Sequence, residues 1–428
     1  MSSSSDPQTR SAHPAGAPPK RSFHISMLLY DQRYRSITIQ VFFLFLLMLF
    51  AAWLVDNTVN NLRALGRDFS FAFLNAPAGY DISQRPIEYN SQMTHGRAAL
   101  VGLLNTLILA VMACVLATIL GVIAGVLRLS NNWIVGRLMT VYVEVFRNIP
   151  TLLWILIFGA IMTEAMPAPS AFRGDTPSAS MLFNDAIAIT NRGVWVPSIL
   201  FERDLGSFRL GPVAPSITWV LVIALLVAGI WANKKIIDHA TRVQNATGLR
   251  PKTWWKSILV ILGPVALLFI ALGAHLEYPE LRGFNFAGGT HLRNSLIAMW
   301  LGLGIYTGAF IAEIVRAGIL AISRGQTEAA FALGLQPSKT MRLVILPQAL
   351  RVIIPPLISN YLNITKNTSL GLAVGYMDLR STLGGITINQ TGRELEGMLL
   401  MMLIYLAISL LISGAMNVYN SRVKLKER

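Results

Sequence analysis

Eight apolar stretches constrain this chain more than any other feature of its sequence. A hydrocarbon core of about 30 Å needs about 20 apolar residues in an α-helix, and most of the stretches reach that length. Hydrophobic residues make up 54% of the chain and charged residues 13%, about half of the charged fraction of a typical soluble domain. The pattern predicts an all-α integral membrane protein with about eight transmembrane helices. The predicted spans are 37–55, 100–127, 141–162, 216–231, 257–274, 295–322, 352–376 and 398–416.

Lysine and arginine are divided unequally between the two sides of this arrangement. Eight spans place both termini on one side, and the segments on that side hold 22 of the 36 basic residues, while the opposite segments hold 12. Because positive residues mark the cytoplasmic side, we expect a multi-pass protein of a bacterial inner membrane with both termini in the cytoplasm. The net charge of +15 is then a topology signal. No basic, aromatic-rich surface on a folded domain points to a nucleic-acid partner.

One predicted cytoplasmic segment, 321–350, carries a helix–turn–helix pattern between two spans. Ser323 followed by Gln326 is typical of a capping box at a helix start. Gly334 suits a left-handed helix end, and Pro337 suits the first turn of a second helix. Such a short helix can dock in a groove of a soluble partner and transmit its motion. It can equally be an ordinary loop helix on the membrane surface, and the pattern alone leaves both open.

The residues of this segment resemble the EAA loop of ATP-binding-cassette (ABC) importer permeases. Glu328, Ala329 and Ala330 are followed after three residues by Gly334, and Pro347 ends a Val-Ile-Leu-Pro run after nine more. The neighbouring text is similar to the polar amino-acid branch of that family in the segments 102–107, 147–150, 312–319, 346–351 and 366–370.

The resemblance implies a type I importer permease (MetI-like) core in two parts, 37–162 and 291–428, after a disordered N-terminal segment, 1–36. Residues 163–290 depart from typical members and add an external loop and two spans. This insertion is similar to the long permeases of general L-amino-acid transporters, which carry glutamate, glutamine, aspartate and asparagine.

The partners and roles that follow are implied by the family. They are an ABC ATPase dimer, a second and related permease, a periplasmic amino-acid-binding protein and membrane lipid. The chain itself is expected to be non-catalytic, without cofactor or metal, because it lacks a G-x-x-x-x-G-K-[ST] motif and the ATPase binds ATP. The residues implied in ATPase coupling are Glu328, Ala329, Ala330, Gly334 and Pro347.

Ionisable residues inside spans are candidate functional groups. Glu144 with Arg147, and Glu313 with Arg316, are three apart near predicted cytoplasmic ends, so structural pairing is favoured for both. Lys366 lies past the middle of a span that Pro355 and Pro356 are expected to break.

A broken helix with a buried cation suits an amino-acid carboxylate. Equally open is a lysine paired with a partner subunit or reaching the surface. The substrate-binding candidates are Asn363, Lys366, Asn367, Thr368 and Ser369. Many relatives that carry basic amino acids have an acid where this chain has Asn367, so acidic and amide substrates are expected.

Two other classes of protein share part of this pattern. A secondary transporter driven by an ion gradient also needs many spans and polar residues near the midplane, but it has no use for an EAA loop. A membrane-embedded enzyme needs metal ligands or a nucleophile–base set, and the six histidines form no H-E-x-x-H pattern.

Overall fold

The computed structural model describes residues 32–423 apart from 65, 67, 175 and 209–213. Its contacts divide the chain into two units, Met1–Ser70 and Phe71–Arg428. In the first unit the main described element is α2 (Gln32–Ala64), whose central apolar side chains are exposed. The predicted N-terminal segment lies outside the described residues except for its last five, which begin α2.

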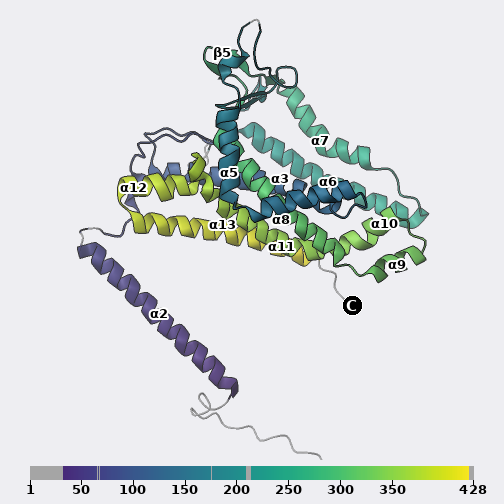
Figure 1. Cartoon of the computed structure of the whole chain (residues 1–428), viewed down its shortest axis with the longest axis horizontal. Coiled ribbons are helices and arrows are strands. Elements are labelled where there is room, and N and C mark those ends of the chain that lie inside the picture. The colour runs from purple at the N-terminus through teal and green to yellow at the C-terminus, as the bar shows by residue number, and fades with distance from the viewer. Residues whose placement is uncertain (1–31, 65, 67, 175, 209–213, 424–428) are drawn as a thin grey trace, which may run out of the picture. The chain divides into compact units, whose positions relative to one another are not determined.

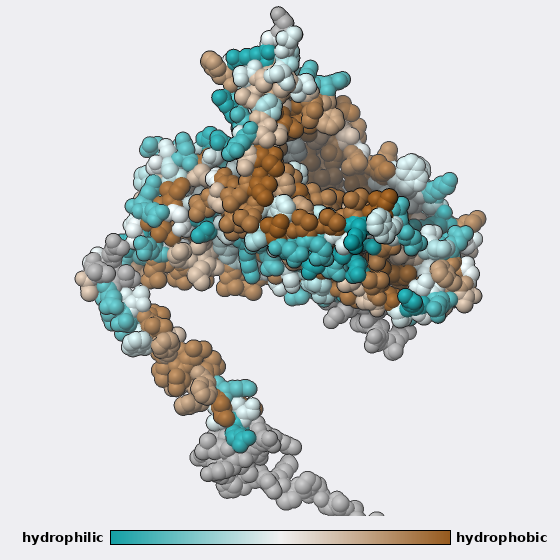
Figure 2. Space-filling view, viewed as in Figure 1, coloured by the Kyte–Doolittle hydropathy of each residue, from teal (hydrophilic) through white to brown (hydrophobic). Residues whose placement is uncertain are grey.

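The second unit consists mostly of helices, which Figure 1 shows as a bundle with a group of short strands at one edge. Within the described residues, seven helices are long and apolar enough to cross a membrane, or eight if one bent pair is a single span. The apolar surface that these helices present is extensive in Figure 2. The prediction of an all-α membrane fold with about eight spans is therefore confirmed. Within the described residues, the α-helices of the second unit, including those too short to span a membrane, are α3 (His95–Leu127), α4 (Trp133–Asn148), α5 (Thr151–Ala160), α6 (Ile217–Thr247), α7 (Trp254–Ala271), α8 (Asn294–Leu320), α9 (Arg324–Ala332), α10 (Pro337–Thr340), α11 (Leu346–Asn367), α12 (Ile388–Thr391) and α13 (Glu394–Val423).

The predicted third span, 141–162, is wrong as a single helix. The chain forms α4 and then α5, extended by a π-helical turn to Ala165, with a bend of 104° between them. Ile149 is extended at the break, with φ −108° and ψ 134°. The cause is Pro150, because a proline ring disfavours the helical conformation of the preceding residue.

The expected break of the seventh span at its prolines is wrong, because the chain is one continuous helix from Pro337 to Val374. Helix α11 runs through both Pro355 and Pro356, and the Asn360 side-chain amide donates to the Pro356 carbonyl at 2.9 Å. Irregular turns instead flank α11: a π-helical turn at Met341–Ile345 and a 3-10 helix at Thr368–Val374. Packing of α11 against α8 and α13 keeps the proline-containing turns helical.

The core of the second unit is the contact between α3 and α8, which run parallel. Small residues recur every four positions on α3, at 113, 117, 121 and 125, and on α8, at 304, 308 and 312. A Cβ added at Gly121 would lie 2.5 Å from Ile311, and one at Gly125 would lie 2.6 Å from the Ala312 carbonyl. Small residues let transmembrane backbones approach this closely, and the gain is van der Waals packing.

Within the described part of the chain, seven short strands join the ends of α5, α6, α7 and α8, and we call them the cap (188–201 and 274–292). They form three small antiparallel sheets, β1–β2–β7, β3–β4 and β5–β6. Trp195 and Phe286 are buried between them. The insertion thus builds a small folded unit that periodicity did not predict, because its strands have only three or four residues each. The strands are β1 (Ala188–Thr190), β2 (Gly193–Val196), β3 (Ser198–Phe201), β4 (Ala274–Glu277), β5 (Glu280–Arg282), β6 (Asn285–Ala287) and β7 (Thr290–Leu292).

Candidate functional site

The predicted helix–turn–helix is present as α9, Gly334 and α10, at the opposite end of α8 from the cap. The prediction of a left-handed helix end at Gly334 is confirmed, with φ +76°. The Leu335 amide donates to the Ala330 carbonyl at 3.1 Å, and the Gly334 amide donates to the Phe331 carbonyl at 2.9 Å. These two bonds are those of a Schellman motif, which ends the helix sharply and turns the chain toward α10.

The predicted capping box at the start of α9 is wrong. Ser323 occupies the N-cap position, but its side chain makes no capping bond. The Gln326 side chain turns instead toward α11, where Gln348 Nε2 lies 3.5 Å from Gln326 Oε1. This contact links the first turn of α9 to the start of α11.

The predicted coupling residues differ in exposure. Glu328 and Ala329 are exposed on α9, whereas Ala330 is 3% exposed and holds α9 against the rest of the chain. Pro347 lies in the first turn of α11, directly after the π-helical turn Met341–Ile345.

Apolar side chains also lie exposed at the end of α9. Leu333 is 82% exposed and Phe331 48% exposed. One carboxylate, one small residue and two large apolar side chains on a short helix form a surface that can bind in a groove of a soluble partner.

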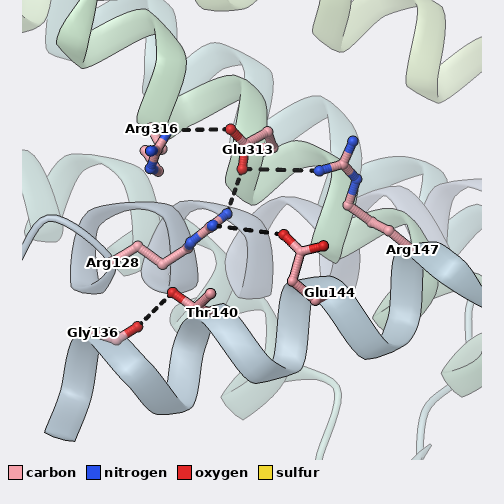
Figure 3. A network of polar contacts seen from close by, with 7 residues as sticks. All are labelled: Arg128, Gly136, Thr140, Glu144, Arg147, Glu313 and Arg316. Atoms are coloured by element: carbon pink, nitrogen blue, oxygen red, sulfur yellow. Dashed lines mark hydrogen bonds and ion pairs between the residues drawn. The ribbon is translucent and has the colours of Figure 1, made fainter.

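Charged residues near this end of the bundle form one network around Glu313 (Figure 3). The carboxylate of Glu313 pairs with Arg128 from the end of α3, with Arg316 at 3.2 Å and with Arg147 from α4 at 3.9 Å. Arg128 also lies 4.0 Å from Glu144. The structure therefore confirms the pairing of Glu313 with Arg316.

The expected pairing of Glu144 with Arg147 is wrong. Each turns instead toward a residue of another element, so the network fastens α3, α4 and α8 together rather than stabilising one turn of α4. The sequence did not point to Arg128 as part of this network, because Arg128 lies one residue beyond the predicted span 100–127. Its side chain is nevertheless only 8% exposed.

The substrate-binding candidates lie where α11 passes into the 3-10 helix, but not as one buried pocket. Lys366 is exposed, which contradicts the expectation of a buried cation, and Asn363 is exposed as well. The reason is helical phase: the neighbouring Ile364 and Thr365 take the buried face of α11.

Of the other candidates, Asn367 and Ser369 are half-buried. Thr368 is fully buried and its hydroxyl donates to the Thr365 carbonyl at 2.9 Å, so its role here is structural.

Arg380 adds a second cation to this segment that the sequence analysis did not identify. Its Nη1 lies 3.5 Å from the Ser369 carbonyl, and its side chain is exposed. The sequence shows an arginine shortly after the Lys366–Ser369 run. Its approach to Ser369 could not be read from the sequence, because it depends on the chain reversing direction after Gly375.

A buried polar cluster supports the return of the chain. Asp378 is fully buried and accepts hydrogen bonds from the amide and hydroxyl of Ser381, both at 2.9 Å. Asn105 of α3 donates to the Met377 carbonyl at 2.9 Å. With its polar groups satisfied, this irregular backbone is tolerated at depth because it is enclosed by protein.

An open cavity of about 560 Å³ lies between α3, α11 and α13. Its lining is apolar except for Cys114 and three hydroxyl-bearing side chains, Thr118, Tyr361 and Thr365. The Thr118 and Tyr361 hydroxyls bond to each other at 2.7 Å, so little of this polarity is free for a ligand.

A family model and two relatives show the family to which this chain is similar. Residues 117–425 match the model of the "binding-protein-dependent transport system inner membrane component" family. The chain is 56% identical to the glutamate/glutamine/aspartate/asparagine transport system permease protein BztB of Rhodobacter capsulatus, over 97% of this chain and 99% of the relative. It is 40% identical to the general L-amino acid transport system permease protein AapQ of Rhizobium johnstonii, over 94% of this chain and 95% of the relative. A solved amino acid ABC transporter covers 77% of this chain and 95% of its own at 17% identity, with a TM-score of 0.43.

Proposed function

Since the chain belongs to the family of binding-protein-dependent transport system inner membrane components, we propose that it forms the translocation pathway for ATP-driven uptake of polar L-amino acids. The observation that carries this proposal is the exposed α9–Gly334–α10 element, with Glu328 and Ala329 facing solvent. A separate ATPase drives transport by moving this element. The chain itself has no catalytic role.

Sidedness follows from the charge distribution. The positive-inside asymmetry assigns α9, α10 and both termini to the cytoplasm and the cap to the external side. The ATPase dimer then meets α9 from below, and a periplasmic binding protein delivers the amino acid on the cap side. A second, related permease completes the pathway.

The substrate proposal rests on two exposed cations near the point where α11 passes into the 3-10 helix. Arg380 lies beside the Ser369 carbonyl, and Lys366 precedes Ser369 by three residues. Asn363 and Asn367 add amide groups. Neither cation takes part in an ion pair found among the described residues. Two such cations favour the carboxylates of acidic amino acids.

The printed substrates of the 56% identical relative, glutamate and aspartate with their amides, agree with this preference. In a competition assay that measures uptake of labelled glutamate, we expect unlabelled glutamate to reduce the uptake more than unlabelled arginine does. A win for arginine would overturn the substrate proposal.

The coupling proposal is testable by crosslinking because the chain has one cysteine, Cys114. In a Cys114→Ala background, Ala329→Cys should form a crosslink to the co-expressed ATPase, and the yield of crosslinked product should change when ATP is added. The matched variant Ala287→Cys, in the cap, should form none. Free labelling of the Ala329→Cys variant by a soluble thiol reagent in the assembled complex would contradict docking at α9.

A further inference from the structure

Helices α6 and α7 form a hairpin that packs chiefly on itself. Among the elements of the described chain, α6 has its main contacts with α7, and α7 has no buried residue. Large apolar side chains are exposed along both helices, among them Ile223, Val227, Leu259 and Leu262. Most of the surface of this hairpin is therefore apolar and uncovered by the rest of the described chain.

Close packing at one point sets the register of the two helices. A Cβ added at Gly229 would lie 2.9 Å from the Ile261 Cα, so the backbones meet there. The helices are antiparallel, so a position five residues beyond Gly229 is level with one five residues before Ile261. These two positions are Lys234 and Lys256, both about 7.5 Å from the crossing at 1.5 Å per residue.

The same level carries aromatic side chains that bind cations. Lys235 Nζ lies 4.3 Å from the ring centre of Trp231, and Lys256 Nζ lies 5.3 Å from that of Trp255. The indoles are exposed, Trp231 by 65% and Trp254 by 67%. Tryptophan rings at one level of a transmembrane hairpin mark the height of the lipid headgroups.

Helix length agrees with this placement. Lys234 is 17 residues into α6, about 26 Å from its start at the cap, and the hydrocarbon core is about 30 Å thick. The three lysines therefore lie at the edge of the hydrocarbon, on the side that the charge distribution assigns to the cytoplasm.

The surrounding segment is strongly basic. Residues 233–256 contain six Lys and Arg and a single acid, Asp238. None of the ion pairs found among the described residues involves any of the six.

We propose that Lys234, Lys235 and Lys256, with Trp231, Trp254 and Trp255, form a binding site for the phosphate headgroup of anionic phospholipid. The ammonium groups bind the phosphate, and the indoles hold the site at the height of the headgroup. The site fixes the depth of the α6–α7 hairpin in the membrane, which its small contact with the remaining helices does not do. This assignment is independent of the proposed transport function.

The test measures lipid binding by the purified full-length chain in detergent, using native mass spectrometry with phosphatidylglycerol and with phosphatidylcholine. We expect the wild type to bind phosphatidylglycerol more tightly. The triple variant Lys234→Gln/Lys235→Gln/Lys256→Gln should weaken that binding by about 100-fold, since each of the three basic residues near an anionic surface contributes about fivefold. Binding of phosphatidylcholine should not change.

The control triple, Arg173→Gln/Arg203→Gln/Arg282→Gln, removes the same charge from the opposite end of the spans and should bind phosphatidylglycerol as the wild type does. A single Lys256→Gln variant, at an exposed position, provides a second measurement if the triple variant folds poorly, and it should show about a fivefold loss. Equal binding by wild type and lysine variants, or equal loss in the control triple, would overturn the proposal. So would full competition by millimolar inorganic phosphate, because the site would then be one for a free anion.

Discussion

Glu313 is the residue on which the charged network depends. Its carboxylate meets three guanidinium groups, from Arg128, Arg147 and Arg316, and Arg128 is almost fully enclosed. A buried cation is tolerated only with a partner, because without one nothing offsets the free-energy cost of removing the charge from water. The network thus ties the bent α4 to α3 and α8 at the end of the bundle that carries α9.

Neutralising Glu313 should destabilise the protein far more than neutralising its neighbour. For Glu313→Gln we expect a loss of about 3 kcal/mol, the lower end of the range for removing one partner of a buried ion pair. Glu144→Gln should cost at most about 1 kcal/mol, because Glu144 is 55% exposed and 4.0 Å from Arg128. Thermal unfolding in detergent, followed by size-exclusion chromatography, measures both. Equal effects of the two variants would contradict the network's organisation around Glu313.

Among the elements, the α3–α8 contact shows what was readable from the sequence and what was not. The spans themselves were predicted, because about 20 apolar residues leave few alternatives in a membrane. The repeated small residues at 113–125 and 304–312 were also present in the sequence, but which two spans they join is known only from the fold. The Pro355–Pro356 pair was misjudged for the same reason, since tertiary packing kept α11 helical.

Enlarging a contact glycine on α3 should separate the two helices. Gly121→Leu would drive a side chain into Ile311 and the Gly308 carbonyl, and overpacking of this kind costs about 1–3 kcal/mol. The matched control is Gly414→Leu on α13, where an added Cβ meets nothing within 4 Å. The yield of folded protein in the membrane and its thermal stability should fall for Gly121→Leu alone. A stable Gly121→Leu protein would show that this contact is looser than described.

At the scale of the whole second unit, the fold places the cap and the α9–α10 element at opposite ends of α8. Asn294 at the start of α8 donates to the carbonyl of Met162 and to that of Asn191 in the cap, and α9 follows the other end of α8. The helix–turn–helix and its Gly334 turn were predicted because a left-handed helix end has a local signal. The neighbourhood of Lys366 was not, since its exposure and the approach of Arg380 depend on packing between distant segments.

The central claim is that α9 transmits the motion of a separate ATPase, and uptake of labelled glutamate by cells carrying Glu328→Arg tests it most directly. The control is Asp238→Arg, the same charge reversal at an exposed acid of α6, outside both α9 and the cap strands. With both proteins confirmed in the membrane, the account predicts that uptake is lost for Glu328→Arg and kept for Asp238→Arg. Unchanged uptake by Glu328→Arg that collapses when the proton or sodium gradient is dissipated would contradict it.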